Sequence, residues 1–404
     1  MTVDENMLIQ KKLDYPDMKT YNCCYGSLDF VDSHSGFLQK NETCTEFHSA
    51  LQVSTEFAYV QCSMKSVIVY EDFYFFLNNH QYRQNARQGD VGAPSVIVLI
   101  LGHTSRHVFH QAMPKTVQYL EQILKAQEFH YLQGHVRTHK NLQNLIRDAF
   151  EEDAREIWLD FARSGYTTAY GDDCSNDESK LTPSDVLLDR FYPFDFNWES
   201  FYAIGRSHIG NQDAGRERPG CLGARPTYAR LLDYAGQYVN LRNDNNPRPL
   251  FGVFYIDAFR YDRGNLRRAD RRFLNFFQTI SSHLNRDTAL MFVGDNVVAE
   301  RVEGGNAKEA AARTAGNYVK SPPLFYFLLP ISYKIEYPDA STALEWNSKK
   351  MVTYADIHST LRDLIKDNRR SAANGYSLLK KIPAGRSCSS LGISPHWCLC
   401  PNGQ

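Results

Sequence analysis

Apolar runs and amphipathic segments alternate along the chain from residue 95 onward. The first run, 96–101, has six aliphatic residues and is closed by Gly102, a pattern typical of a fully buried parallel strand. Apolar runs at 250–256, 288–293 and 324–329 predict further strands of this kind, each preceded or followed by an amphipathic stretch that predicts a helix. This alternation predicts an α/β fold: a three-layer α/β/α sandwich with a mostly parallel central sheet.

Two regions of different character flank the predicted sandwich. Residues 1–92 have a β-rich pattern, because β-branched and aromatic residues cluster over 66–77 and a linker-like stretch with Gly and Pro follows at 88–94. Residues 371–404 form a cysteine-containing tail that we expect to pack on the main domain. The predicted organisation is therefore an N-terminal region (1–92), an α/β domain (93–370) and this tail.

Composition and charge agree with a sizeable globular protein. Of 404 residues, 43% are hydrophobic and 23% are charged, which excludes a disordered chain. Lys+Arg 45 against Asp+Glu 46 leaves a net charge of −1, so no overall field favours nucleic acid. The arginine-rich stretch 267–272 lacks the interleaved aromatic residues of a nucleic-acid site. We interpret it as a solvated helix face and expect no nucleic-acid partner.

The apolar runs are also too short to cross a membrane. They fall far short of the roughly 20 residues that a bilayer requires. Residues 1–12 lack the apolar core of a signal peptide. We therefore expect no membrane span and no signal peptide in this chain.

The cysteines indicate an oxidising compartment. Seven of the nine lie before the predicted sheet or in the tail, where disulfides are more typical than buried thiols. Zinc ligation is the alternative, but these cysteines lack the C-x2-C pairs of common structural zinc sites. A glycosylation sequon begins at Asn41, between two of them, so we expect an extracellular or lumenal glycoprotein. The cysteines expected in disulfides, with their pairing left open, are Cys23, Cys24, Cys44, Cys62, Cys388, Cys398 and Cys400.

Five segments carry a resemblance to a known family. They are 95–116 (SVIVLILGHTSRHVFHQAMPKT), 157–173 (IWLDFARSGYTTAYGDD), 221–234 (CLGARPTYARLLDY), 353–365 (TYADIHSTLRDLI) and 377–400 (SLLKKIPAGRSCSSLGISPHWCLC). In order and spacing they resemble a metazoan family of sulfatase-like proteins, a domain of unknown function within the alkaline phosphatase superfamily. The resemblance covers most of the chain after residue 90 and implies an alkaline phosphatase-like sandwich.

The resemblance also implies a metal-dependent site at the carboxyl ends of the strands. Hydrolases of this superfamily use one or two divalent cations to activate a hydroxyl nucleophile, and carboxylates and imidazoles are suitable ligands. In this chain Gly102 stands where the family has an aspartate, and Tyr261 and Asn296 stand where it has histidines. Asp262 and Asp295 remain as vestigial metal ligands, so the resemblance implies a degraded site.

Thr138 occupies the position of the family's nucleophile. The family has a Thr-Phe-Pro-Asn run after an Asp-Asn pair, whereas here His139 and Lys140 replace Phe and Pro, and Val136 replaces the acidic residue. A threonine hydroxyl is a poor nucleophile without a metal or base to activate it. We therefore interpret Thr138 as a vestigial nucleophile that now serves as a helix-terminus residue.

Histidines near both segments leave a rebuilt metal site open. His103 follows the first strand, and His135 and His139 flank Thr138, in segments that the family fold would bring together. Zinc could be bound by His103 with His135 or His139. Alternatively, several of the 13 histidines simply lie near a cleft of a polar chain. We expect no cofactor, with a divalent metal such as zinc only if this site is rebuilt.

Two functions of different classes follow. The first is a catalytically inactive relative that acts by binding an anionic extracellular ligand through Arg106, Arg137 and Arg260 near the former cleft. The second is an active metal-dependent phosphate or sulfate ester hydrolase with rebuilt ligands. We favour the first, because three expected ligands are replaced.

Overall fold

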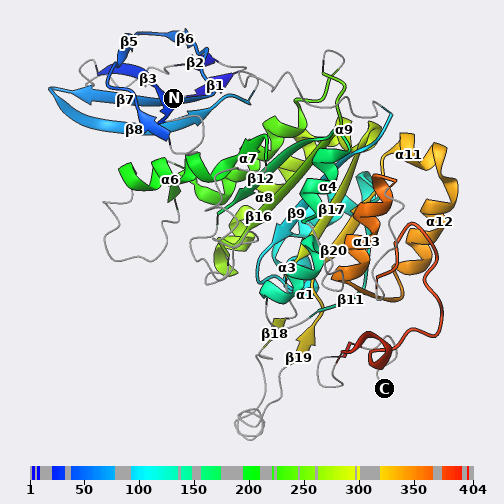
Figure 1. Cartoon of the computed structure of the whole chain (residues 1–404). Coiled ribbons are helices and arrows are strands. Elements are labelled where there is room, and N and C mark those ends of the chain that lie inside the picture. Colours follow the sequence, from blue (N-terminus) through cyan, green and yellow to red (C-terminus); the bar gives the residue numbers. More distant parts are fainter. Residues whose placement is uncertain are drawn as a thin grey trace, which may run out of the picture.

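The structure is a computed structural model of the whole chain (Figure 1). It describes residues 2–4, 7–9, 21–31, 38–77, 92–134, 138–147, 156–173, 194–209, 221–222, 225–243, 246–259, 263–295, 298–300, 319–366, 375–393 and 398–399.

A central seven-stranded sheet forms the body of the molecule (Figure 1). Its strands, in spatial order, are β10 (Gln127–Glu128), β20 (Phe325–Leu328), β17 (Thr288–Gly294), β9 (Ser95–Leu101), β16 (Leu250–Ile256), β12 (Thr167–Asp172) and β13 (Phe196–Asn197). The five strands from β17 to β13 are mutually parallel. At one edge β20 and β10 pair antiparallel. The predicted mostly parallel sheet is confirmed.

Both faces of this sheet are buried, which explains the continuous apolar runs. Along β9, Ile97 and Leu99 contribute to the core on one face, and Val96 and Val98 contribute to the core on the other. A strand covered on both sides has no solvent face to carry polar residues.

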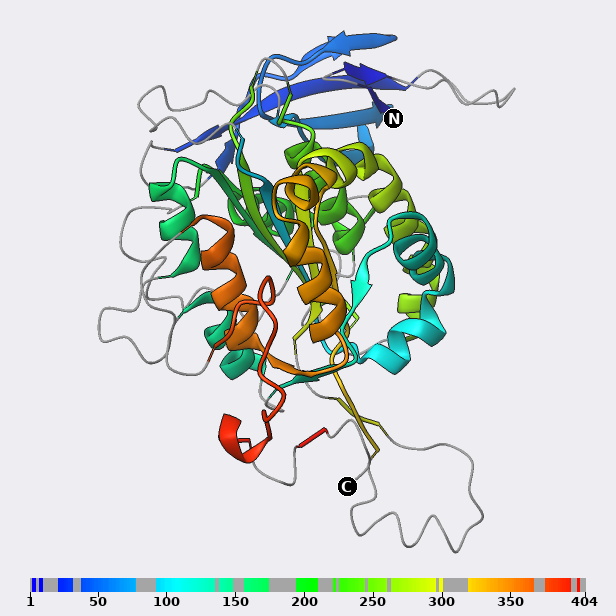
Figure 2. The same ribbon diagram turned by 90° about the vertical axis from the view of Figure 1, so that its right-hand side faces the viewer.

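Helices cover the two faces of the sheet, as Figure 2 shows. Helices that contribute to the core on one face include α1 (Arg106–Ala112), α2 (Pro114–Gln118), α7 (Thr227–Val239) and α8 (Arg263–Thr279). Those that contribute to the core on the other face include α3 (Thr138–Ile146), α4 (Ile157–Arg163), α12 (Pro338–Asn347) and α13 (Tyr354–Leu364). The predicted three-layer sandwich is confirmed.

Further helices and three strand pairs complete this part of the molecule. They are η2 (Tyr119–Ile123), α6 (Trp198–Ile209), α9 (Ser281–Arg286), α11 (Ile331–Glu336), η5 (Ser389–Leu391), and the strand pairs β11 (Tyr131–Gln133) with β21 (Met351–Thr353), β14 (Cys221–Leu222) with β15 (Arg225–Pro226), and β18 (Val298–Glu300) with β19 (Val319–Ser321). The α-helix that begins at Pro114 ends at Gln118, where the π-helix η2 follows it directly.

The N-terminal region is built from strands, as predicted. One sheet contains β4 (Leu38–Lys40), β3 (Asn22–Phe30), β7 (Phe57–Met64) and β8 (Val67–Phe75) in this order, with β5 (Thr45–Phe47) also paired to β3. A smaller sheet contains β1 (Thr2–Asp4), β2 (Met7–Ile9) and β6 (Ala50–Gln52). Figure 1 shows these strands above α6 and α7.

Edge-to-face aromatic contacts and an ion pair join this region to the sandwich. Phe75 of β8 contacts Trp198 and Phe201 of α6, with ring centroids 5.8 Å and 5.2 Å apart. Arg230 of α7 pairs with Asp72 of β8. The exact limits of the three predicted regions stay predictions.

No helix within the described ranges is both long and apolar enough to cross a membrane.

Candidate functional site

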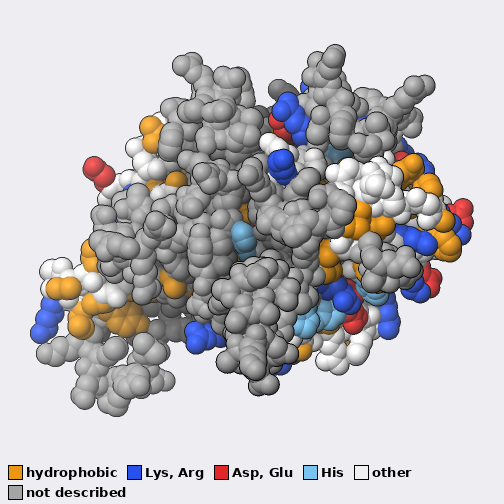
Figure 3. All heavy atoms as spheres, turned by 90° about the horizontal axis from the view of Figure 1, so that it is seen from below, with side chains coloured by type: hydrophobic (Ala, Val, Ile, Leu, Met, Phe, Trp, Pro, Cys, Tyr) orange, Lys and Arg blue, Asp and Glu red, His pale blue; other side chains and the backbone are white. Residues whose placement is uncertain are grey.

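Three neighbouring parallel strands end level with one another in the middle of the sheet. Leu101 of β9 pairs with Ile256 of β16 on one side and with Gly294 of β17 on the other. The residues that follow these strands therefore come together at the carboxyl edge, where open α/β sheets bind ligands. Figure 3 views the molecule from this side.

The residues that meet at this edge are His103, Asp257 and Asp295, here called the strand-end site. Each offers one ligand atom, and these atoms lie within 4.8 Å of one another. Asp257 and Asp295 are fully buried. His103 has a left-handed backbone, with φ of 52°, and its amide donates to Asp295 Oδ1 at 2.7 Å. The strand ends thus gather one imidazole and two carboxylates.

Gly102 leaves room for one of these carboxylates. A Cβ at position 102 would lie 2.6 Å from Asp257 Oδ1 and 3.1 Å from Asp257 Cα. The carboxylate of Asp257 therefore occupies the space where a side chain at position 102 would begin. The strand next to β9 supplies the acidic group that the end of β9 lacks.

The two buried carboxylates share a neutral donor. The hydroxyl of Tyr255 lies 3.0 Å from Asp295 Oδ2 and 3.4 Å from Asp257 Oδ1. Burial raises the pKa of Asp295, and the nearby charge of Asp257 adds to this rise, although His103 and Tyr255 oppose it. Two carboxylates this close together in a buried site favour a bound cation or proton, because burying unpaired charge is costly.

Further aspartates support the strand-end site from β12. Asp173, which follows β12, accepts a hydrogen bond from the amide of Asp257 at 2.6 Å. Asp172 accepts one from the hydroxyl of Tyr170, and both carboxylates are buried. This edge therefore carries buried aspartates from β12, β16 and β17.

Helix α3 begins beside the same edge. The side chain of Asn141 is fully buried and donates to the carbonyl oxygen of Asp295 at 2.9 Å. Thr138, at the first position of α3, comes three residues before Asn141. The side chains of Thr138 and His139 lie outside what the structure describes, so the interpretation of Thr138 stays a prediction.

The donor set of the strand-end site fits a divalent cation. One imidazole nitrogen and two carboxylate oxygens suit zinc or manganese better than an all-oxygen cation such as Ca²⁺. Of the histidine combinations considered from the sequence, His103 is here, and His135 lies outside the described residues. The partners that the structure gives His103 are aspartates.

Sequence reasoning did not single out Asp257. The family pattern placed the surviving aspartate of this strand end at Asp262, which lies outside the described residues together with Tyr261. The signal was nonetheless present, because Asp257 follows the last residue of a buried strand directly.

Of the three arginines proposed to bind an anion, the structure describes Arg106. Arg106 lies in α1, and its guanidinium forms a two-pronged ion pair with Glu128, with Nη2 2.7 Å from Oε2. Arg137 and Arg260 lie outside the described residues. Their assignment to an anionic ligand stays a prediction, and the pair with Glu128 limits how freely Arg106 can take part.

Disulfides form in both cysteine-rich parts of the chain. Cys23–Cys62 links paired residues of β3 and β7, Cys24–Cys44 links β3 to the turn before β5, and Cys388–Cys398 closes a loop in the tail. This supports disulfides over zinc ligation for these six residues. Cys400 lies outside the described residues.

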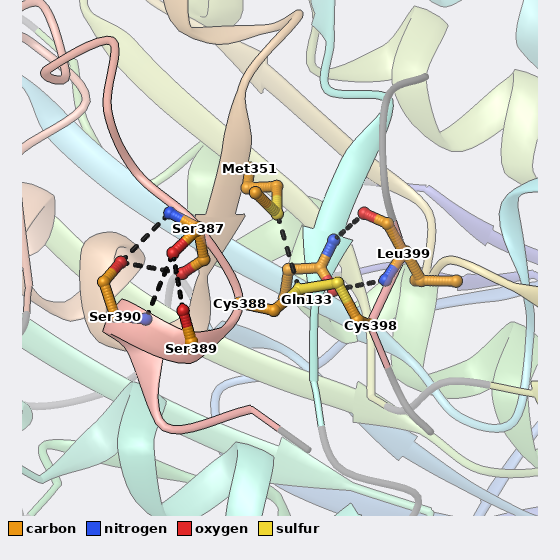
Figure 4. The surroundings of a disulfide bond; sticks show 8 residues. All are labelled: Gln133, Met351, Ser387, Cys388, Ser389, Ser390, Cys398 and Leu399. Carbon is orange, nitrogen blue, oxygen red and sulfur yellow. Dashed lines mark hydrogen bonds between the residues drawn. A yellow bond between two sulfur atoms is a disulfide. The ribbon is translucent and has the colours of Figure 1, made fainter. Parts of the chain in front are cut away.

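The tail disulfide lies next to the segment that leads into α3, as Figure 4 shows. Gln133 of β11 donates to the carbonyl of Leu399 at 2.6 Å and accepts from its amide at 3.0 Å. A second contact between this part of the chain and the sandwich is the ion pair between Arg386 and Asp356.

Asn41 begins its sequon in the turn between β4 and β5. Its side-chain oxygen accepts from the amide of Thr43 at 3.0 Å, and its amide nitrogen donates to Asp29 at 3.1 Å. Asn41 is partly exposed. Glycosylation there stays a prediction.

Comparison with known proteins identifies a family. The family model described as "Protein of unknown function (DUF229)" matches residues 1–147 and 132–404. No curated protein matches the chain significantly.

Solved structures with a similar arrangement share little sequence. The C-terminal periplasmic domain of EcEptC from Escherichia coli, in complex with Zn, is 12% identical, with 70% of this chain and 85% of that chain covered and a TM-score of 0.44. The phosphoethanolamine transferase EptA from Neisseria meningitidis is 10% identical (73% and 58% covered, TM-score 0.46). A TAB5 alkaline phosphatase mutant is 9% identical (70% and 100% covered, TM-score 0.38). With such low scores, no conclusion about this chain is drawn from these matches.

Proposed function

The chain belongs to the family of proteins of unknown function DUF229, and on this premise we propose that it is an extracellular or lumenal, alkaline phosphatase-like binding protein. It holds one divalent cation at the strand-end site and has lost ester hydrolysis. Its ligand is anionic and binds at the carboxyl edge of the sheet.

The main support for the cation site is the position of the Asp257 carboxylate beside Gly102. A carboxylate missing from the end of β9 is replaced in space by one from β16, within 4.8 Å of ligand atoms of His103 and Asp295. When bound, the cation would supply positive charge that neutralises Asp257 and Asp295 and attracts an anion. His103 and the two aspartates would hold it, while Tyr255 and the amide of His103 keep the carboxylates in place.

The loss of hydrolysis is supported by the sequence. Tyr261 and Asn296 stand at positions where the family has imidazoles, and neither side chain is as good a ligand for zinc. The segment around Thr138 lacks the family's acidic residue and its Phe-Pro pair. A threonine in such a setting has little to lower the pKa of its hydroxyl.

The location is supported by the disulfides. Three of them close in the described parts of the chain, and disulfides persist mainly in extracellular and lumenal compartments. The glycosylation sequon at Asn41 points the same way.

One observation favours the second candidate, an active phosphate or sulfate ester hydrolase. Asn141 fixes α3 to the backbone of Asp295, so the helix that starts with Thr138 begins near the strand-end site. A hydrolase would use Thr138 as its nucleophile, as the family resemblance implies.

Metal content tests the cation site, and turnover separates the two functions. Elemental analysis of the purified full-length chain should find a divalent ion, and Asp257→Asn should contain one equivalent less. The control Asp339→Asn, which changes an exposed aspartate of α12, should keep it. Equal metal content in all three proteins would refute the cation site.

Assays with aryl phosphate, phosphodiester and sulfate esters address hydrolysis. We expect the wild-type chain to show no more turnover than Thr138→Ala. Turnover that is abolished by Thr138→Ala would establish the hydrolase and overturn the binding function.

A further inference from the structure

A second group of acidic and imidazole side chains lies at the antiparallel edge of the central sheet. His110, Glu121 and Glu128, here called the edge cluster, each offer one ligand atom, and these atoms lie within 4.8 Å of one another. None of them belongs to the strand-end site. On the face seen in Figure 3, histidine side chains gather beside acidic and basic ones.

Three elements bring the edge cluster together. His110 lies in the last turn of α1, Glu121 in the π-turn η2, and Glu128 in β10, directly opposite Tyr326 of β20. π-helical turns are rare and are found frequently at functional sites. Here the π-turn carries one of the three ligand residues.

Short contacts already join the members of the cluster. His110 Nε2 lies 2.6 Å from Glu128 Oε1. The hydroxyl of Tyr326 donates to Glu121 Oε1 at 2.9 Å and lies 3.1 Å from His110 Nε2. A further imidazole, that of His130, has its Nε2 3.5 Å from Glu128 Oε2. The polar atoms of five side chains therefore surround one small region.

Glu128 is held in place by Arg106 on its other side. Arg106 donates Nε to Oε1 at 2.8 Å and Nη2 to Oε2 at 2.7 Å. A carboxylate offers about four acceptor sites, so this pair leaves lone pairs for another partner. Burial opposes ionisation of Glu128, but the hydrogen bonds from His110 and Arg106 outweigh it and lower its pKa to about 2.

We propose that the edge cluster is a second metal site, which binds a divalent cation of the zinc class through His110, Glu121 and Glu128. Imidazole combined with carboxylate suits zinc and similar transition metals, whereas Mg²⁺ and Ca²⁺ prefer oxygen ligands alone. Binding replaces the contact between His110 and Glu128 by two metal–ligand bonds. The half-exposed His130 is near enough to supply a fourth ligand.

The test uses the full-length chain in an Asp257→Asn background, so that its outcome does not depend on the strand-end site. Zinc binding is measured by calorimetric titration, and bound Co²⁺ by its visible absorption. The matched pair is His110→Ala/Glu121→Gln and His107→Ala, the latter changing a neighbouring histidine of α1 that lies outside the cluster.

We expect the double variant to lose one equivalent of zinc, or to bind it at least ~10-fold more weakly, since even outer support around a metal is worth ~10–100-fold. It should also lose the Co²⁺ absorption, while His107→Ala keeps both. Circular dichroism checks that the double variant is folded. Zinc affinity and Co²⁺ absorption that are unchanged in a folded double variant would overturn the second site, as would equal losses in His107→Ala.

Discussion

Arg230 and Asp72 form a fully buried ion pair between α7 and the N-terminal sheet. Arg230 Nη1 lies 2.9 Å from Asp72 Oδ1, and the two side chains are 0% and 2% exposed. Burial lowers the pKa of Arg230 to about 10, although the charge of Asp72 opposes this, so the guanidinium is charged at neutral pH. The same arginine donates to the carbonyl of Phe73. The N-terminal sheet and the sandwich therefore share one charge pair from which water is excluded.

Removing one partner of this pair should be costly. We expect Asp72→Asn to lower the free energy of unfolding by about 3–5 kcal/mol, because it leaves Arg230 buried without its main counter-ion. Glu71→Gln is the control, since Glu71 lies in the same strand and pairs with Lys40 with both side chains 23% exposed. It should cost about 0–1 kcal/mol. Urea unfolding measures both, and equal losses would contradict the role given to the buried pair.

Because the carboxylate of Asp257 fills the space beside Gly102, a carboxylate placed at position 102 should be able to replace it. Gly102→Asp alone should destabilise the chain and weaken its cation binding, because the new Cβ would lie 2.6 Å from Asp257 Oδ1. Gly102→Asp combined with Asp257→Ala should recover at least part of both losses, since the space is then filled from β9. Thermal melting with and without zinc reports both effects. A double variant worse than either single change would show that the two positions do not share this space.

The tail disulfide should stabilise the contact between Leu399 and Gln133. Cys388→Ser opens a loop with a sequence separation of 10, and closing a loop of this size is worth about 3 kcal/mol in the chain-entropy model. We expect the amide of Leu399, which donates to Gln133, to exchange with deuterium at least ~10-fold faster. Cys221→Ser, which changes a free and exposed cysteine, should leave this exchange unchanged.

Non-reducing peptide mapping should recover the three disulfides in the wild-type chain.

Asp287 should make stability depend on pH in the acid range. Burial opposes its ionisation, but His283, Arg242 and Arg286 outweigh burial and lower its pKa to about 2. The folded state thus favours the charged form, and this stabilisation is present above the ordinary pKa of 3.8 and lost as pH falls to about 2. Asp287→Asn should therefore cost about 2 kcal/mol near neutral pH. Urea unfolding from pH 6 downward should show the gap closing between about pH 4 and pH 2; a gap that is constant across this range would exclude Asp287 as its cause.

The fold could be predicted because its central strands are buried on both faces. Continuous apolar runs such as that of β9 have few other structural explanations when amphipathic helices separate them. The edge strand β10 could not be predicted, because its two residues are Gln and Glu, and a polar pair of this kind has no strand pattern. The π-turn η2 was also hidden, since one widened turn barely alters the spacing of apolar residues.

Two of the three residues of the strand-end site were expected from the sequence. Asp295 and His103 follow buried strands and were expected near the cleft, and the structure places them together. Asp257 was missed because a family pattern compares positions along the chain, whereas proximity depends on strand register. The pair of Arg106 with Glu128 also had no signal, since its residues lie in different elements 22 positions apart.

The contact between Gly102 and Asp257 has a consequence for how the family should vary. A side chain at position 102 and the carboxylate of Asp257 compete for one volume, so relatives should carry an acidic residue at one of these positions and a small one at the other. In an alignment, such a pair of substitutions would show an acidic residue lost at position 102 and an acidic residue gained at position 257. Judging a relative inactive from position 102 alone would then mistake a moved ligand for a missing one.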